Sequence, residues 1–81
     1  MRAAILVCTG ASDPFVTREH RSTFEEEMIA ANADWQLHVH ANAVHGFTER
    51  GVHRAGARYD EATDRRTWHA MRAFLDEKLP T

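Results

Sequence analysis

The sequence predicts an α/β fold in which strands and helices alternate in the order β-α-β-α. Three observations support it: residues 3–9 form a continuous apolar stretch, residues 35–39 alternate apolar and polar side chains, and two longer segments repeat apolar residues at helical spacing. Two strands joined through a helix run parallel, and parallel sheets need several strands covered on both faces. We therefore expect two parallel strands and two helices that form one end of a larger doubly wound sheet.

The first strand and the first helix are separated by a short turn-forming segment. The apolar stretch 3–9 ends at Gly10, as expected of a strand buried on both faces, and a loop follows through Pro14. Thr17 suits the N-cap of a helix and Asn32 suits its exit. Between them, one apolar stripe at helical spacing comprises Phe24, Met28 and Ala31.

The second strand and the second helix are separated by a longer stretch. Residues 35–39 alternate as in a strand with one drier face, whereas residues 41–59 contain three glycines and are expected to be irregular. Helical spacing returns from Glu61 to Leu79, with Pro80 just past the end. We expect core packing along the apolar stripe of this helix, which comprises Trp68, Met71, Leu75 and Leu79.

Composition excludes several classes of protein. The chain has 43% hydrophobic and 27% charged residues, which is ordinary for a soluble globular protein. Its longest apolar run, Ala3–Cys8, is far shorter than the roughly 20 residues of a membrane span. One cysteine allows neither an internal disulfide nor a CxxC zinc site, and a net charge of −2 gives no support to nucleic-acid binding. We expect a cytoplasmic protein that binds neither nucleic acid nor membrane.

Two ionisable residues follow the two predicted strands. Asp13 comes shortly after the first strand and His45 shortly after the second. The carboxyl ends of parallel strands meet at one rim of the sheet, where ligands bind in open α/β folds. A carboxylate bonded to one imidazole nitrogen fixes the tautomer and supports general-base chemistry. The order of aspartate before histidine also agrees with a hydrolase catalytic triad.

Several short motifs, taken in order, resemble one family. They are Leu6-Val-Cys-Thr-Gly-Ala-Ser-Asp-Pro-Phe-Val16, Asp34-Trp-Gln-Leu-His-Val39, Ala43-Val-His-Gly-Phe-Thr48, Ala57-Arg-Tyr-Asp60, Arg66-Thr-Trp68 and Arg72-Ala-Phe-Leu75. Together they are similar to the C-terminal part of the dienelactone hydrolase family of α/β hydrolases. The resemblance implies that residues 1–81 are that part of the domain, with Asp13 as the triad acid and His45 as the triad histidine.

The resemblance also implies an activity and a missing component. Members hydrolyse carboxylic esters or lactones with a Cys or Ser nucleophile on a G-x-C/S-x-G elbow and use no metal or organic cofactor. No such elbow occurs in these residues, so we expect a truncated chain that lacks the nucleophile-bearing N-terminal part and is inactive alone. Dienelactone-type members also carry an arginine four residues after the histidine, where this sequence has Glu49 followed by Arg50.

Other functions are compatible with parts of the sequence. His38, His40 and His45 could share a metal ion, but polar residues alternating on the wetter face of a strand are the stronger explanation of the first two. Cys8 lies within an apolar strand, where burial makes a thiol inert. From a different class, a non-catalytic interaction module would bury its exposed sheet edge by self-association or against another chain.

Overall fold

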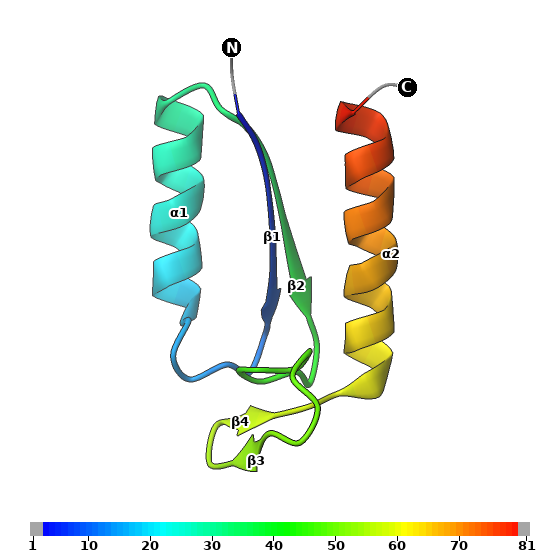
Figure 1. The fold of residues 1–81 in the computed structure, drawn as a ribbon. Helices are drawn as coiled ribbons and strands as arrows, with labels where there is room; N and C mark the ends of the chain where they lie inside the picture. The colour runs from blue at the N-terminus through cyan, green and yellow to red at the C-terminus, as the bar shows by residue number, and fades with distance from the viewer. Residues whose placement is uncertain (1–2, 80–81) are drawn as a thin grey trace.

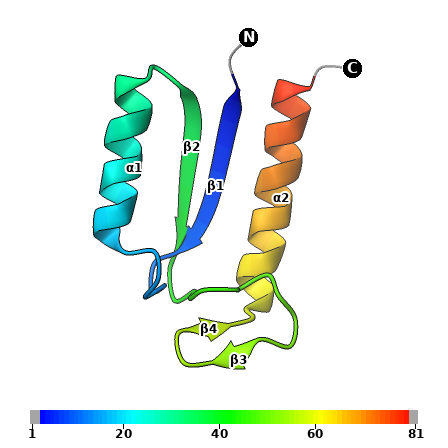
Figure 2. The ribbon, with the colours of Figure 1, turned by 60° about the vertical axis from the view of Figure 1, so that its left-hand side comes forward.

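The computed structural model describes residues 3–79 and places two helices on opposite faces of a two-stranded sheet. Figures 1 and 2 show the same three layers from two directions, with α1 on one side of the strands and α2 on the other. The elements are β1 (Ala4–Gly10), α1 (Arg18–Ala30), β2 (Asp34–His40), β3 (His53–Arg54), β4 (Ala57–Arg58) and α2 (Glu61–Lys78). This arrangement confirms the predicted α/β class. The predicted β-α-β-α order holds for the four long elements, and the short strands β3 and β4 are added before α2.

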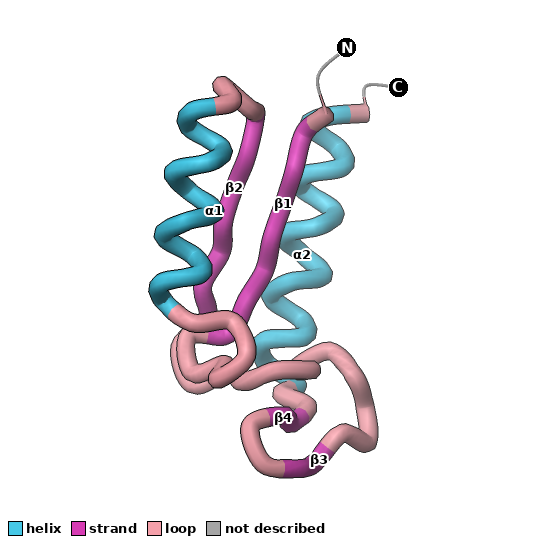
Figure 3. Tube along the Cα trace, turned by 90° about the vertical axis from the view of Figure 1, so that its left-hand side faces the viewer, coloured by secondary structure: helices cyan, strands magenta, loops and turns pink. Residues whose placement is uncertain are grey.

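The two long strands run parallel along their whole length. Their register begins at Ala4 opposite Asp34 and ends at Gly10 opposite His40, so both strands finish at the same level. Figure 3 shows that the loops leaving these two ends, together with the β3–β4 hairpin, gather at the carboxyl end of the sheet. The predicted common rim is therefore present.

The alternation along β2 separates an apolar face from a polar one. On the α1 side, the Trp35 ring meets the Phe24 ring edge to face, with 5.9 Å between centroids. On the α2 side, Gln36 and His38 line a shallow groove with Phe74, and their side chains form a hydrogen bond of 3.3 Å. The alternating pattern therefore separates the apolar from the polar residues correctly. The expectation that the apolar face is the drier one is wrong, because Gln36, His38 and His40 are half-buried on the side of α2 while Val39 is 44% exposed.

Both helices begin at capping residues. The Thr17 hydroxyl accepts a hydrogen bond from the His20 backbone N–H, and the Thr17 N–H donates to Nδ1 of the His20 ring. The Asp60 carboxylate caps α2 by accepting from the N–H and the hydroxyl of Thr63, and these bonds lower the pKa of Asp60. In the described part of the chain, neither helix combines the length and the apolar content that a membrane crossing requires.

The segment expected to be irregular contains a small antiparallel hairpin. Strand β3 pairs with β4 so that His53 lies opposite Arg58 and Arg54 lies opposite Ala57. Gly56, in the connecting turn, has a φ of +77°, which favours glycine. The expectation of an irregular segment is wrong here because two-residue strands of mostly polar side chains are too short to display an alternation.

The apolar stripe of α2 is more exposed than the sequence predicts. Trp68 remains 57% exposed, and the other members, Met71, Leu75 and Leu79, are exposed as well. A sheet of two strands is too narrow to cover this stripe, because α2 packs against β1, which has no further strand beside it in residues 3–79. The expectation of core packing is therefore wrong for the described chain.

Candidate active site

Asp13 and His45 meet at the carboxyl end of the sheet. The distance between Nδ1 of His45 and the carboxylate oxygen Oδ2 of Asp13 is 3.2 Å, within hydrogen-bond range. The Asp13 side chain is 5% exposed, whereas the His45 side chain is 47% exposed. A buried carboxylate thus holds one ring nitrogen, while half of the imidazole is left open to solvent or to a ligand.

The second oxygen of the Asp13 carboxylate is held by the backbone that follows it. Its Oδ1 accepts hydrogen bonds from the N–H of Phe15, at 2.8 Å, and of Val16, at 3.3 Å. Asp-Pro commonly forms such a turn, and here the turn fixes the direction in which the other oxygen points. The local turn and the contact with His45 are therefore parts of one arrangement.

The loops that carry these two residues are bonded to each other. The N–H of Ala11 donates to the carbonyl of His40 at 2.8 Å, and that of Ser12 donates to the carbonyl of Ala43 at 3.0 Å. Gly10 makes this approach possible, because a Cβ at that position would clash with the Ala43 carbonyl. The sequence indicates Gly10 only as the end of a strand and gives no sign of this close contact.

The β3–β4 hairpin fixes the backbone of His45. The His45 N–H donates to the carbonyl of Gly56 at 3.2 Å, and the His45 carbonyl accepts from the N–H of Arg58 at 3.0 Å. A Cβ on Gly56 would lie 2.7 Å from Cγ of Pro14, which follows Asp13. One hairpin thus lies against His45 and against the residue that follows Asp13, a positioning role that sequence reasoning misses.

A cavity of about 330 Å³ opens beside the pair. Its lining residues include Asp13, His45, Phe47, Thr48 and Glu49. The Phe15 ring lies edge-on to the imidazole with 5.1 Å between centroids, so it helps to fix the plane of the histidine ring. The arrangement can exchange a proton with a group placed in this cavity.

Cys8 lies in β1, and its surroundings differ from those of a reactive thiol. It lines both the cavity and a larger groove of about 600 Å³, whose other walls include Trp68 and Met71 of α2. Burial raises the pKa of the Cys8 thiol, which disfavours the nucleophilic thiolate. The structure agrees with the expectation of a structural cysteine.

The other histidines on β2 have separate environments. The ring of His38 is bonded to Gln36, while His40 lies against Phe47 with its Nε2 buried and without a hydrogen-bond partner in the described chain. In residues 3–79, no group of three or more His, Cys, Asp or Glu side chains is arranged to hold a metal ion. His38 and His40 are therefore packed between the sheet and α2, not joined to His45 in one site.

The environment of His40 predicts a loss of stability in mild acid. Burial, followed by the charges of His38 and Arg66, lowers the pKa of His40 below its ordinary value of 6.5. Between these two pKa values the unfolded chain binds more protons, so the free energy of unfolding should fall as the pH drops below 6.5. Thermal unfolding from pH 7.5 to 5.5 should show this decline, and His40→Gln should flatten it. An equal slope in both proteins would contradict the assignment.

Comparison with known proteins agrees with this geometry. The sequence profile described as "Dienelactone hydrolase family" matches residues 1–79. The chain is 38% identical to the dienelactone hydrolase-like promiscuous phosphotriesterase P91, from metagenomic libraries, with a TM-score of 0.84, and covers 32% of that structure. It is 37% identical to the structure called m3DLH, with a TM-score of 0.81, and covers 33% of it. These matches cover 91% and 94% of this chain.

A curated relative is also similar over most of the chain. An uncharacterised protein of Caenorhabditis elegans, K02A2.1, is 35% identical over 77 residues, an alignment that covers 91% of this chain and 49% of the relative. The chain thus spans about half the length of this relative and about a third of the two solved structures. With the profile matched from end to end of the described residues and the fold shared with two solved relatives, the chain belongs to the dienelactone hydrolase family.

Proposed function

We propose that Asp13 and His45 are the acid and the base of a nucleophile–His–Asp triad in a carboxylic ester or lactone hydrolase. The observation that carries this proposal is the 3.2 Å contact between His45 Nδ1 and a carboxylate oxygen of the buried Asp13. A buried acid, a half-open imidazole and an adjoining cavity are the features that general-base catalysis requires. Family membership and the two structural relatives support hydrolase chemistry.

The geometry supports a definite division of labour. With Asp13 accepting a hydrogen bond from Nδ1–H, the Nε2 of His45 carries the lone pair and can take the proton of a Cys or Ser nucleophile. The imidazolium that forms is stabilised by the carboxylate and then protonates the leaving alcohol. A water molecule, activated by the same nitrogen, releases the acyl group. Each of these proton transfers uses Nε2, and none requires a metal or an organic cofactor.

No residue in the described part of the chain lies where this mechanism requires a nucleophile. Cys8 lies within β1, its pKa is raised by burial, and it precedes Asp13 by only a short turn. Backbone donors of an oxyanion hole come from the nucleophile elbow in this mechanism, and no G-x-C/S-x-G motif occurs in the sequence. Catalysis in this proposal therefore needs residues beyond these 81.

A comparison of the chain alone with a hybrid protein tests this proposal. In the P91 hybrid, residues 3–79 replace the matching third of P91, so that the remainder of that fold supplies the nucleophile. The 81-residue chain should hydrolyse 4-nitrophenyl acetate no faster than free imidazole at equal concentration, whereas the hybrid should turn it over. A folded hybrid without esterase activity, or a His45-dependent turnover by the chain alone, would contradict the proposal.

A second candidate function is an interaction module. Strand β1 pairs only with β2 among the described residues, and its other edge carries no charged side chain between Ala4 and Gly10. The exposed apolar side chains of Trp68, Met71 and Leu75 lie on α2, the helix that packs against this strand. Such an edge can add strands from another copy. Sedimentation of the 81-residue chain tests this second function. A folded monomer argues against self-association, and a discrete oligomer supports it.

A further inference from the structure

The cavity beside His45 has an unusual charge for a site that binds an uncharged ester. Its walls include the carboxylates of Asp13 and Glu49, and no lysine or arginine of residues 3–79 lines it. The Asp13 carboxylate is already engaged, because it is buried and accepts from two backbone N–H groups and the His45 ring. Glu49 therefore contributes the one carboxylate of this cavity that remains available to a ligand.

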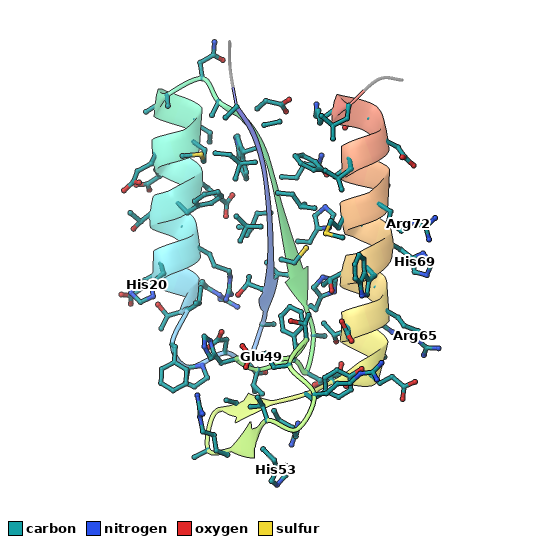
Figure 4. All side chains as sticks on the ribbon, in the orientation of Figure 1. His20, Glu49, His53, Arg65, His69 and Arg72 are labelled. Carbon is teal, nitrogen blue, oxygen red and sulfur yellow. The ribbon has the colours of Figure 1, made fainter. Side chains whose placement is uncertain are left out.

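The backbone of Glu49 is fixed while its side chain is free. Its N–H donates to the carbonyl of Gly46 at 3.0 Å, and its carbonyl accepts from the N–H of Val52 at 3.2 Å. The side chain is exposed and forms no hydrogen bond or ion pair with the described part of the chain. Figure 4 shows Glu49 beyond the carboxyl ends of β1 and β2, on the side of the sheet where the loops gather.

Two arginines that adjoin residues of the cavity wall have other partners. Arg50 lines the neighbouring groove with Asp64 and interacts with the hydroxyl of Tyr59. The Arg21 guanidinium donates to the backbone carbonyl of Val16 at 3.4 Å. The labelled basic side chains of α2, Arg65, His69 and Arg72, project away from the sheet in Figure 4. Within residues 3–79, the acidic and basic side chains that line the cavity, apart from His45, are therefore the carboxylates of Asp13 and Glu49.

We infer that Glu49 sets the charge of the substrate, so that the site accepts esters bearing an alkylammonium group and disfavours esters bearing a carboxylate. This inference rests on the proposed function, because it concerns the group that occupies the cavity while His45 acts. Opposite charges a few ångströms apart at a partly exposed site attract modestly, and like charges repel by a similar amount. Together, the two effects should separate a cationic from an anionic substrate by about tenfold in kcat/KM.

Three 4-nitrophenyl esters with acyl chains of equal length test the inference in the P91 hybrid. The chains end in a methyl, a trimethylammonium or a carboxylate group, so the leaving group and the chemistry stay the same. Glu49→Gln should lower the ratio of kcat/KM for the cationic ester over the anionic ester by about tenfold, and the methyl ester reports any effect of the substitution that does not depend on substrate charge. Glu49→Arg should shift the ratio further in the same direction, and high salt should weaken both shifts.

A matched control separates Glu49 from the general charge of the protein. Glu26→Gln removes an exposed carboxylate on α1, outside the cavity, and should leave the ratio unchanged. An unchanged ratio in Glu49→Gln, or an equal change in Glu26→Gln, overturns the inference while the hydrolysis of the methyl ester upholds the proposed function. A folded hybrid that hydrolyses none of the three esters overturns both.

Discussion

Replacing His45 with alanine in the P91 hybrid should lower kcat/KM for 4-nitrophenyl acetate by about 10³-fold or more. The substitution removes the one ring whose Nδ1 is held by the buried Asp13 and whose other nitrogen is free to take the nucleophile's proton. Stopped-flow or steady-state assays of nitrophenolate release measure the effect directly. Asp13→Asn should lower kcat/KM by about 10²- to 10⁴-fold, because an amide no longer favours the productive tautomer of His45.

The double variant provides the sharper result. Residues that act as one unit are strongly non-additive, so His45→Ala combined with Asp13→Asn should be no slower than His45→Ala alone. His53→Ala is the matched control, since His53 is exposed on β3 and Figure 4 shows it at the far side of the hairpin. Multiplication of the two single effects would mean that the residues act independently, which the contact between them does not allow.

Gly10→Ala should destabilise the fold by about 3 kcal/mol, which corresponds to a fall of roughly 6–12 °C in the Tm of the hybrid. The added Cβ would clash with the Ala43 carbonyl, so the ends of β1 and β2 would have to move apart. Asp13 and His45 lie on the two loops that leave these ends, and their contact should lengthen with the same movement. We therefore expect kcat to fall together with the Tm.

Gly51→Ala serves as the comparison for this substitution. No atom lies within 4 Å of a Cβ added at Gly51, although its φ of +87° imposes some backbone strain. A left-handed backbone costs an alanine about 1–2 kcal/mol, so Gly51→Ala should be the milder change and should spare kcat. Equal losses of Tm in the two variants would mean that the contact between Gly10 and Ala43 does not determine the site.

The parts of the fold that the sequence predicts are those with a strong local signal. The apolar stretch of β1 and the alternation along β2 identify two parallel strands. The carboxyl ends of neighbouring parallel strands lie at the same edge of the sheet, independently of the loops that follow them. Asp13 and His45 can therefore be placed near each other before any coordinates exist. Their contact follows from topology, which a sequence pattern can reveal.

The remaining features depend on contacts between distant segments. The β3–β4 hairpin has strands of two residues, and its hydrogen bonds to His45 have no counterpart in periodicity or composition. The need for glycine at position 10 appears only when the Ala43 carbonyl is placed beside it. The exposure of Trp68 is likewise hidden, because an amphipathic helix looks the same whether or not a sheet is wide enough to cover it.

The tautomer of His45 tests the central claim most directly. Nitrogen-15 NMR of the hybrid labelled at histidine should show the neutral His45 ring with its proton on Nδ1 and an unprotonated Nε2, and Asp13→Asn should abolish this preference. That outcome would place the basic lone pair where a nucleophile can use it. A neutral ring protonated on Nε2, unaffected by Asp13→Asn, would contradict the role assigned to both residues.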